Sequence, residues 1–215
     1  KPTKSFNDYE KYVGSKAEQL DPGEMIDLDD LVTITCLASN ERVTTDSSVG
    51  KGKDENDKSI VLLLQFGDFG YFTGGDIAFS TERKIAEKNL VTDVDVCKAD
   101  HHGSHLSSDC DFMTSLNPTV IIISNGSKDK YQHPRKVTLD CYDQLPSHPE
   151  VLQTNKYLGK GNDAGNVPDQ YIADPELTDE DGTILVDVNL PQNQYDVRYR
   201  DIIMKFPIKK RSQKH

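Results

Sequence analysis

Three histidines stand within five residues of one another in the segment Asp100-His101-His102-Gly103-Ser104-His105. A buried imidazole needs hydrogen-bond partners, so packing alone is a poor explanation for such a cluster, although a merely polar role stays open. Neutral imidazole is also the commonest metal ligand in proteins. The adjacent pair, His101 and His102, is therefore the first candidate for metal chemistry.

Asp76 is the second candidate, because it directly follows two glycines, Gly74 and Gly75. Glycines let the backbone turn sharply and approach a ligand closely, which leaves the carboxylate exposed at the end of a strand. Taken alone, such an aspartate more often belongs to a plain hairpin or to the entry of a helix. Combined with the histidines, the aspartate completes a donor set suited to zinc, manganese or iron.

His133 precedes Pro134 at the predicted start of a helix, where a histidine alone is most often a helix-entry residue. Its position in the chain gives it a second interpretation. If the strands before these residues lie side by side in one sheet, Asp76, the pair 101–102 and His133 emerge at the same edge. The two remaining histidines that lie outside this arrangement receive no role: His148 and His215.

The apolar pattern predicts the elements that position these residues. Residues 31–39 alternate and are rich in β-branched side chains, as in a half-buried strand. Residues 59–66 form an apolar run of strand length, and a tight turn at 67–70 leads to a second short strand at 71–73. This hairpin ends at the glycines before Asp76.

Helices are expected after the later strands. Ser80 can cap the first of them, and Ser108 stands at the start of a capping box for a short helix that ends near Leu116. Strands are predicted at 93–99 and 119–124. A third helix begins near Pro134, and its expected buried face consists of Val137, Cys141 and Leu145.

This alternation predicts an α/β fold, an α+β sandwich with helices on a sheet and functional groups at strand ends. We expect a lead-in segment at 1–21 and one domain at 22–215. Within that domain, 42–58 reads as a long loop, and 161–181 as an acidic loop without Lys or Arg. Residues 183–190 and 194–206 then look like a closing β-hairpin.

The composition narrows the function classes. A formal charge of -11 argues against a broad basic surface for nucleic acid, so any such contact would be local. No run reaches the roughly 18 to 20 apolar residues of a membrane span, and the sequence assigns no compartment. The four cysteines lack CxxC spacing, which favours buried free thiols, with one disulfide as the alternative.

The ordered succession of these motifs resembles a known family. It contains an apolar hairpin ending in TGGD, a strand into KADHHGSHLSS, the segment NPTVIIISNG and then YQHP. This order is similar to the second half of the metallo-β-lactamase-like domain in the ComEC/Rec2 DNA-uptake branch. The resemblance covers roughly residues 22–155, and HHGS followed by SNG and HP is its most specific part.

The resemblance implies an αββα sandwich, a centre with one or two metal ions, and hydrolysis, with phosphodiester bonds of nucleic acid as the substrate class. Asp76 would be the bridging or second-metal aspartate, and His101, slightly favoured over His102, the late histidine ligand. His102 would then either support a metal ligand or contact the substrate, and His133 would hold a phosphate or leaving group. Ser104 and Lys98 are minor candidates for orienting the site.

One family motif is missing. HxHxDH, which supplies most ligands of the first metal, is absent, because no histidine occurs before position 101. Either the chain is one piece of a longer or cleaved polypeptide, which we favour, or it is a degenerate homologue without catalysis. In the first case the partner is the N-terminal half of the same domain.

Three functions therefore compete. The first is a metal-dependent phosphodiesterase, nuclease-like, which is completed by the missing half. The second is an inactive binding or scaffolding domain that keeps the fold. The third is a hydrolase of other esters, since this fold hosts many reactions and the acidic surface disfavours a polyanion.

Overall fold

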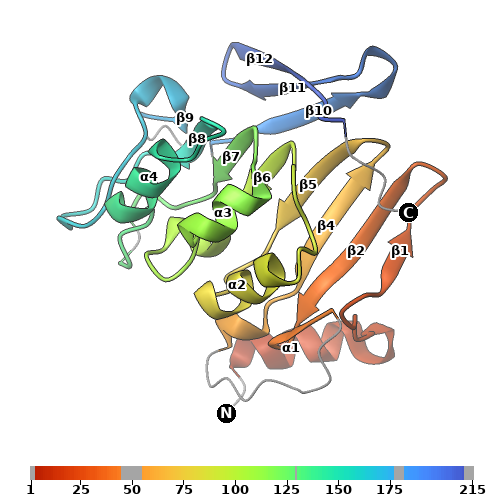
Figure 1. Ribbon diagram of the computed structural model, residues 1–215. Helices are drawn as coiled ribbons and strands as arrows, with labels where there is room; N and C mark the ends of the chain where they lie inside the picture. The colour runs from red at the N-terminus through yellow and green to blue at the C-terminus, as the bar shows by residue number, and fades with distance from the viewer. Residues whose placement is uncertain (1–2, 45–54, 129, 177–181, 211–215) are drawn as a thin grey trace.

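The computed structural model describes residues 3–44, 55–128, 130–176 and 182–210. Within these ranges the main feature is a nine-stranded sheet with the order β1-β2-β4-β5-β6-β7-β8-β9, in which β3 pairs with β2 (Figure 1). Its strands are β1 (Met25–Asp27), β2 (Val32–Ser39), β3 (Arg42–Val43), β4 (Val61–Phe66), β5 (Phe69–Thr73), β6 (Val96–Lys98), β7 (Val120–Ile123), β8 (Glu150–Asn155) and β9 (Ile172–Asp174).

The sheet is mixed. Strands β1 to β5 pair antiparallel, whereas β5 to β9 pair parallel. The predicted hairpin is confirmed: β4 and β5 meet at a tight turn, with Phe66 opposite Phe69. The carboxyl ends of β5, β6 and β7 therefore lie at one edge of the sheet, as the site prediction requires.

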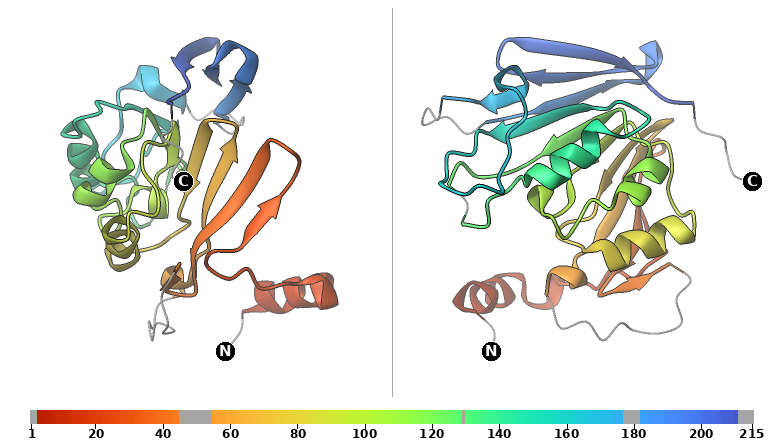
Figure 2. Two further views of the ribbon diagram at one scale, coloured as in Figure 1. Left: turned by 45° about the vertical axis from the view of Figure 1, so that its right-hand side comes forward. Right: turned by 60° about the vertical axis from the view of Figure 1, so that its left-hand side comes forward.

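Three helices cover one face of the sheet: α2 (Phe79–Glu87), α3 (Cys110–Leu116) and α4 (Lys136–Asp143) (Figures 1 and 2). They follow β5, β6 and β7 in turn, because a parallel crossover needs a connecting segment that packs on the sheet. The core between the helices and the sheet includes Phe72, Ile85 and Ile121.

Three details of these helices differ from the prediction. The N-cap of α2 is Ala78 rather than Ser80. Asp109 caps α3 by accepting the N–H groups of Asp111 and Phe112, while Ser108 hydrogen-bonds Tyr142 instead. In α4, Val137 is exposed, because the face toward the protein consists of Thr138, Cys141, Tyr142 and, beyond the helix end, Leu145.

A smaller sheet covers the opposite face. It consists of β10 (Leu185–Asn189), β11 (Gln194–Tyr199) and β12 (Ile202–Pro207), so the expected two-stranded closing hairpin has a third strand. Residues 194–206 form two strands because the chain turns at Arg200, which has a φ of 48°. A second core, between the two sheets, includes Phe69, Val120 and Tyr195.

The described residues thus form helices, a large mixed sheet and a small sheet, which confirms the predicted α/β sandwich class. The expected acidic loop at 161–181 contains β9, which joins the sheet edge; its residues 177–181 lie outside the described ranges, as do 45–54 of the expected loop at 42–58. The helix α1 (Lys4–Val13), in the expected lead-in segment, buries none of its residues.

Short 3-10 helices complete the described structure: η1 (Gly14–Lys16), η2 (Asn56–Lys58), η3 (Asp100–Gly103), η4 (Asp169–Tyr171) and η5 (Leu190–Gln192). Among the helices in the described ranges, none is long and apolar enough to cross a membrane.

Candidate functional site

The candidate residues meet at the carboxyl edge of the parallel strands. Asp76 follows β5, the pair 101–102 follows β6, and His133 lies in the connection from β7 to α4. All four side chains line one cavity of about 700 Å³. The sequence prediction that these residues share one edge of the sheet agrees with this arrangement.

The two glycines before Asp76 are needed for close packing. A Cβ atom on Gly74 would lie 2.5 Å from Oδ1 of Asp100, and Gly75 has a φ of +65°, which L side chains rarely adopt. The N–H of Asp76 then donates to Oγ of Ser59 at 3.1 Å. The turn therefore joins the backbone of Asp76 to Ser59, which precedes β4 in the chain.

The histidine pair lies in an unusual backbone conformation. His101 and His102 both have left-handed φ values, 47° and 58°, and Gly103 follows at 79°. The N–H of His101 donates to the carbonyl of Gly75 at 2.8 Å. This hydrogen bond joins the turn at 101–103, called the histidine turn, to the turn at 74–75, called the glycine turn. Left-handed conformations in non-glycine residues are uncommon and cluster at functional sites.

The ring of His102 is held by a backbone carbonyl and faces Asp76. Its Nδ1–H donates to the carbonyl of Ser124 at 2.6 Å, and its Nε2 lies 3.6 Å from Oδ1 of Asp76. A backbone carbonyl at one ring nitrogen fixes the tautomer that leaves the other nitrogen available as a ligand. The resemblance slightly favoured His101 over His102, and the contact with Ser124 could not be foreseen, because only the fold brings Ser124 beside His102.

His133 is buried and lies beside both members of the pair. Its ring centroid is 5.4 Å from that of His101 and 6.3 Å from that of His102, and Tyr131 stacks on it at 5.9 Å. Arg135, two residues further on, also holds the turn at 101–103 in place, because its N–H donates to the carbonyl of Gly103 at 2.8 Å. Sequence reasoning missed Tyr131 and Arg135, which also line the cavity.

A buried pair of carboxyl groups lies behind the site. Asp100 and Glu82 are 2% and 0% exposed and hydrogen-bond each other. Desolvation raises the pKa of both, and that of Asp100 well above its ordinary value, so Asp100 keeps a proton that it donates to Glu82. Glu82 also accepts the N–H groups of Ser108 and Asp109 at 2.7 and 2.8 Å.

The two minor candidates make local contacts. Ser104 is buried at the cavity wall, and its Oγ accepts the N–H of Leu106 at 3.2 Å. The ammonium group of Lys98 donates to the carbonyl of Ala99 at 3.2 Å. Both therefore support the backbone around the histidine turn.

The donor set fits a metal in type but is incomplete in number. Imidazole and carboxylate groups are the ligands of zinc, manganese and iron. Within the described ranges, however, no group of three or more His, Cys, Asp or Glu side chains is arranged to hold an ion. Asp76 and His102, whose Oδ1 and Nε2 lie 3.6 Å apart, could supply two ligands.

Comparisons with known proteins give one sequence relative. The chain is 32% identical over 103 residues to ComE operon protein 3 of Bacillus subtilis (strain 168). The match covers 47% of this chain and 13% of the relative, so the chain spans a small part of that protein. This similarity supports the relation to ComEC-type proteins that the motifs indicate. No family model matches the chain.

A solved structure from Parabacteroides distasonis, provisionally called a metal-dependent hydrolase, is also similar. The likeness has a TM-score of 0.43 at 13% identity and covers 68% of this chain and 60% of that one. At this TM-score the likeness does not establish a shared fold.

Proposed function

We propose that this chain carries half of a metal-dependent hydrolase site whose substrate is a phosphodiester. The observation that carries the proposal is the gathering of Asp76, His101, His102 and His133 around one cavity at the carboxyl edge of parallel strands. The similarity to ComE operon protein 3 supports it, because the motifs that resemble the ComEC branch contain these same residues.

Asp76 and one histidine of the pair would hold the metal, zinc first and manganese or iron as alternatives. The resemblance favours His101 as the ligand. The hydrogen bond from Nδ1 of His102 to Ser124, with Nε2 toward Asp76, supports His102 instead. When bound, the ion supplies Lewis-acid activation of water and stabilisation of developing negative charge.

His133 would bind the reacting phosphate group or the leaving group. It is buried beside both other histidines, so a ligand in the cavity meets its imidazole together with the pair. The guanidinium group of Arg135, at the same cavity wall, is a second group that suits an anion, although it also pairs with Asp163. These contacts would orient the phosphodiester relative to Asp76.

The remaining metal ligands would come from the N-terminal half of the domain, as a separate or cleaved partner. That half would contain HxHxDH, the motif that this chain lacks. The incomplete donor set within the described residues is consistent with this division.

The same incompleteness supports a second candidate function, a binding or scaffolding domain without catalysis. The acidic charge of the chain, -11, favours a third, a hydrolase of esters that are not nucleotides, because a polyanion would approach against the field. Assays on neutral esters and on phosphodiesters separate these two functions from the first.

The first test is the intact mass of the purified protein together with elemental analysis for metals. We expect a companion polypeptide and near-stoichiometric zinc or manganese. Hydrolysis of bis(p-nitrophenyl) phosphate by this sample should be lost in Asp76→Asn and kept in His148→Asn, whose residue precedes β8 at the opposite end of the strands. A single species of 24.1 kDa without metal or hydrolysis would contradict the proposal.

A further inference from the structure

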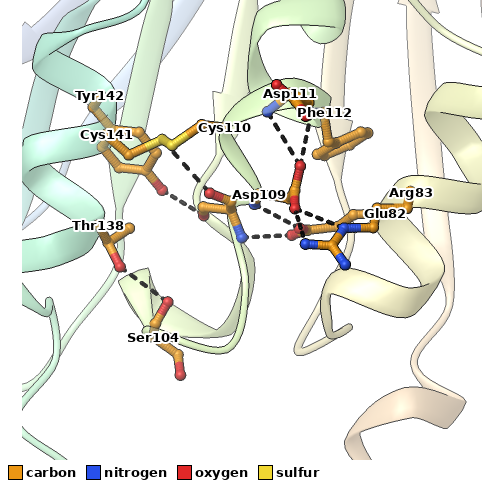
Figure 3. Close-up of a disulfide and its surroundings, with 11 residues drawn as sticks. Glu82, Arg83, Ser104, Asp109, Cys110, Asp111, Phe112, Thr138, Cys141 and Tyr142 are labelled. Carbon is orange, nitrogen blue, oxygen red and sulfur yellow. Dashed lines mark hydrogen bonds and ion pairs between the residues drawn. A yellow bond between two sulfur atoms is a disulfide. The ribbon is translucent and has the colours of Figure 1, made fainter.

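A disulfide joins α3, which follows the pair 101–102 in the chain, to α4, which follows His133. Cys110, the first residue of α3, is bonded to Cys141 of α4, with their Cα atoms 5.9 Å apart (Figure 3). The favoured prediction of free thiols is therefore wrong for this pair, and the alternative of one disulfide is confirmed; Cys36 and Cys97 are free and buried. Spacing gave no signal, because the two partners are 31 residues apart and meet only in the fold.

The disulfide belongs to a larger contact between α4 and residues 104–110, which we call the clamp segment. Thr138 donates from its Oγ1 to the carbonyl of Ser104 at 3.0 Å (Figure 3). The hydroxyl of Tyr142 shares a hydrogen bond of 2.6 Å with Ser108. Because residues 138, 141 and 142 lie on one face of α4, the helix contacts the clamp segment at three points along that face.

Helix α2 holds the other side of the clamp segment. Glu82 accepts the N–H groups of Ser108 and Asp109. Arg83 donates from its Nε to Asp109 at 2.8 Å (Figure 3). The clamp segment follows directly from the histidine turn, and His133 lies just before α4. The attachment of the clamp segment to α4 therefore influences the distance between the pair 101–102 and His133.

The disulfide is accessible to a reagent. Cys110 is exposed, Cys141 is 7% exposed, and both line a second cavity of about 290 Å³. The other two cysteines are 0% and 1% exposed, and burial raises the pKa of both thiols. A thiol reagent therefore reaches the exposed Cys110 side of the disulfide before it reaches either of the two buried cysteines.

We propose that Cys110–Cys141 is a thiol-exchange site whose reduction loosens the clamp segment and, with it, the histidine turn. A thiolate of a dithiol reductant attacks Sγ of Cys110, which forms a mixed disulfide, and Cys141 leaves as a thiolate that takes up a proton. The second thiol of the reductant then resolves the mixed disulfide. Two electrons pass to the protein, which gains two thiols, while the reductant becomes a cyclic disulfide.

Reduction loosens the clamp segment because the disulfide is the only covalent bond in the contact between α4 and residues 104–110 as the structure describes it. Without it, Thr138 and Tyr142 hold α4 on the clamp segment by hydrogen bonds alone, which open locally at lower free energy. The consequence for metal binding rests on the proposed function. The consequence for the backbone does not, so the two can be tested separately.

The accessibility is tested by treating the native protein briefly with dithiothreitol, alkylating it with iodoacetamide and locating the label by peptide mass spectrometry. We expect label on Cys110 and Cys141 and none on the two buried cysteines. Label on Cys110 before reduction, or reduction only under conditions that also expose Cys36 and Cys97, would overturn the proposal.

The loosening is tested by amide hydrogen exchange before and after reduction. We expect exchange several-fold faster across 103–109, with no change in β4 and β5. The double variant Cys110→Ser/Cys141→Ser should exchange as fast as the reduced protein and be insensitive to dithiothreitol; if it fails to fold, the reduced native protein still gives the result. Unchanged exchange, or equal acceleration in β4 and β5, would refute the clamp.

Zinc titration of the native protein and of the double variant tests the link to the proposed site. We expect several-fold weaker binding in the variant. Equal affinity would refute the coupling of the clamp to the site. An absence of zinc binding in both proteins would contradict the proposed function. The hydrogen-exchange experiment would still test whether reduction loosens the clamp segment.

Discussion

Oδ1 of Asp100 accepts the backbone N–H of Gly74 at 2.9 Å, and through this contact the histidine turn and the glycine turn share one buried carboxyl group. The same carboxyl group hydrogen-bonds Glu82 of α2. Glu82 in turn binds two N–H groups of the clamp segment. These two acids therefore join β5, α2 and the segment between β6 and α3.

Asp100→Asn should keep the fold, because its amide oxygen can accept from Gly74 while its N–H donates to Glu82. In Glu82→Gln one of the two acceptor oxygens becomes an NH₂ group. One of the two backbone N–H groups that Glu82 binds then loses its acceptor. We expect Glu82→Gln to lower the free energy of unfolding by about 1–3 kcal/mol and Asp100→Asn to lower it by less. Urea denaturation measures both, and equal losses would contradict the assigned proton.

Stability should also depend on pH through Asp100. Its pKa is raised in the folded protein, so the folded state holds a proton that the unfolded state releases above the ordinary value of 3.8. This stabilisation is complete below that value and is lost as pH rises through the folded pKa. Denaturation from about pH 4 to about pH 8 should show a shallower decline in Asp100→Asn than in the native protein. Parallel profiles would argue against a protonated Asp100.

Gly74→Ala tests the close approach of the glycine turn to Asp100. The new Cβ would lie 2.5 Å from Oδ1, so the turn must shift, at a cost on the order of 1–3 kcal/mol. Gly126→Ala is the matched control at the same cavity, because a Cβ there would meet nothing within 4 Å. Thermal unfolding should separate the two, and equal stability would mean that the turn accommodates a side chain.

Tyr195→Ala tests the packing of the small sheet on the large one. Tyr195 is fully buried, contacts Phe69 edge-on at 5.2 Å and donates to the carbonyl of Asp95 at 3.2 Å. Its truncation should cost about 3–5 kcal/mol, whereas Tyr12→Ala in α1, where Tyr12 is 90% exposed, should change stability by less than about 0.5 kcal/mol. A mild effect of Tyr195→Ala would show that the small sheet is loosely attached.

The sequence predicted those parts of the fold whose signal is local. The hairpin at 59–73 and the strand at 119–124 have continuous apolar runs and clear turn residues, and both formed where expected. Strand β9 was missed because its three residues, Ile172–Asp174, pair only with β8, and so depend on a neighbour outside their own pattern.

The site was predictable as a meeting of strand ends but not in its supporting contacts. Asp76 and the histidines stand out by residue type and by their place after strands. Glu82 lies in the first turn of α2, and its partners, Ser108 and Asp109, lie 26 and 27 residues away. Contacts of this separation arise from packing and leave no periodic trace in the sequence.

The most direct test of the central claim is a zinc titration, by calorimetry, of the purified protein and of three variants: Asp76→Asn, His102→Asn and His148→Asn. Asparagine is chosen for the histidines because it tolerates their left-handed backbone. We predict that the native protein binds zinc, that Asp76→Asn and His102→Asn each weaken binding by roughly tenfold or more, and that His148→Asn binds normally. No binding by the native protein, or equal binding by all four, would contradict a metal site at Asp76 and His102.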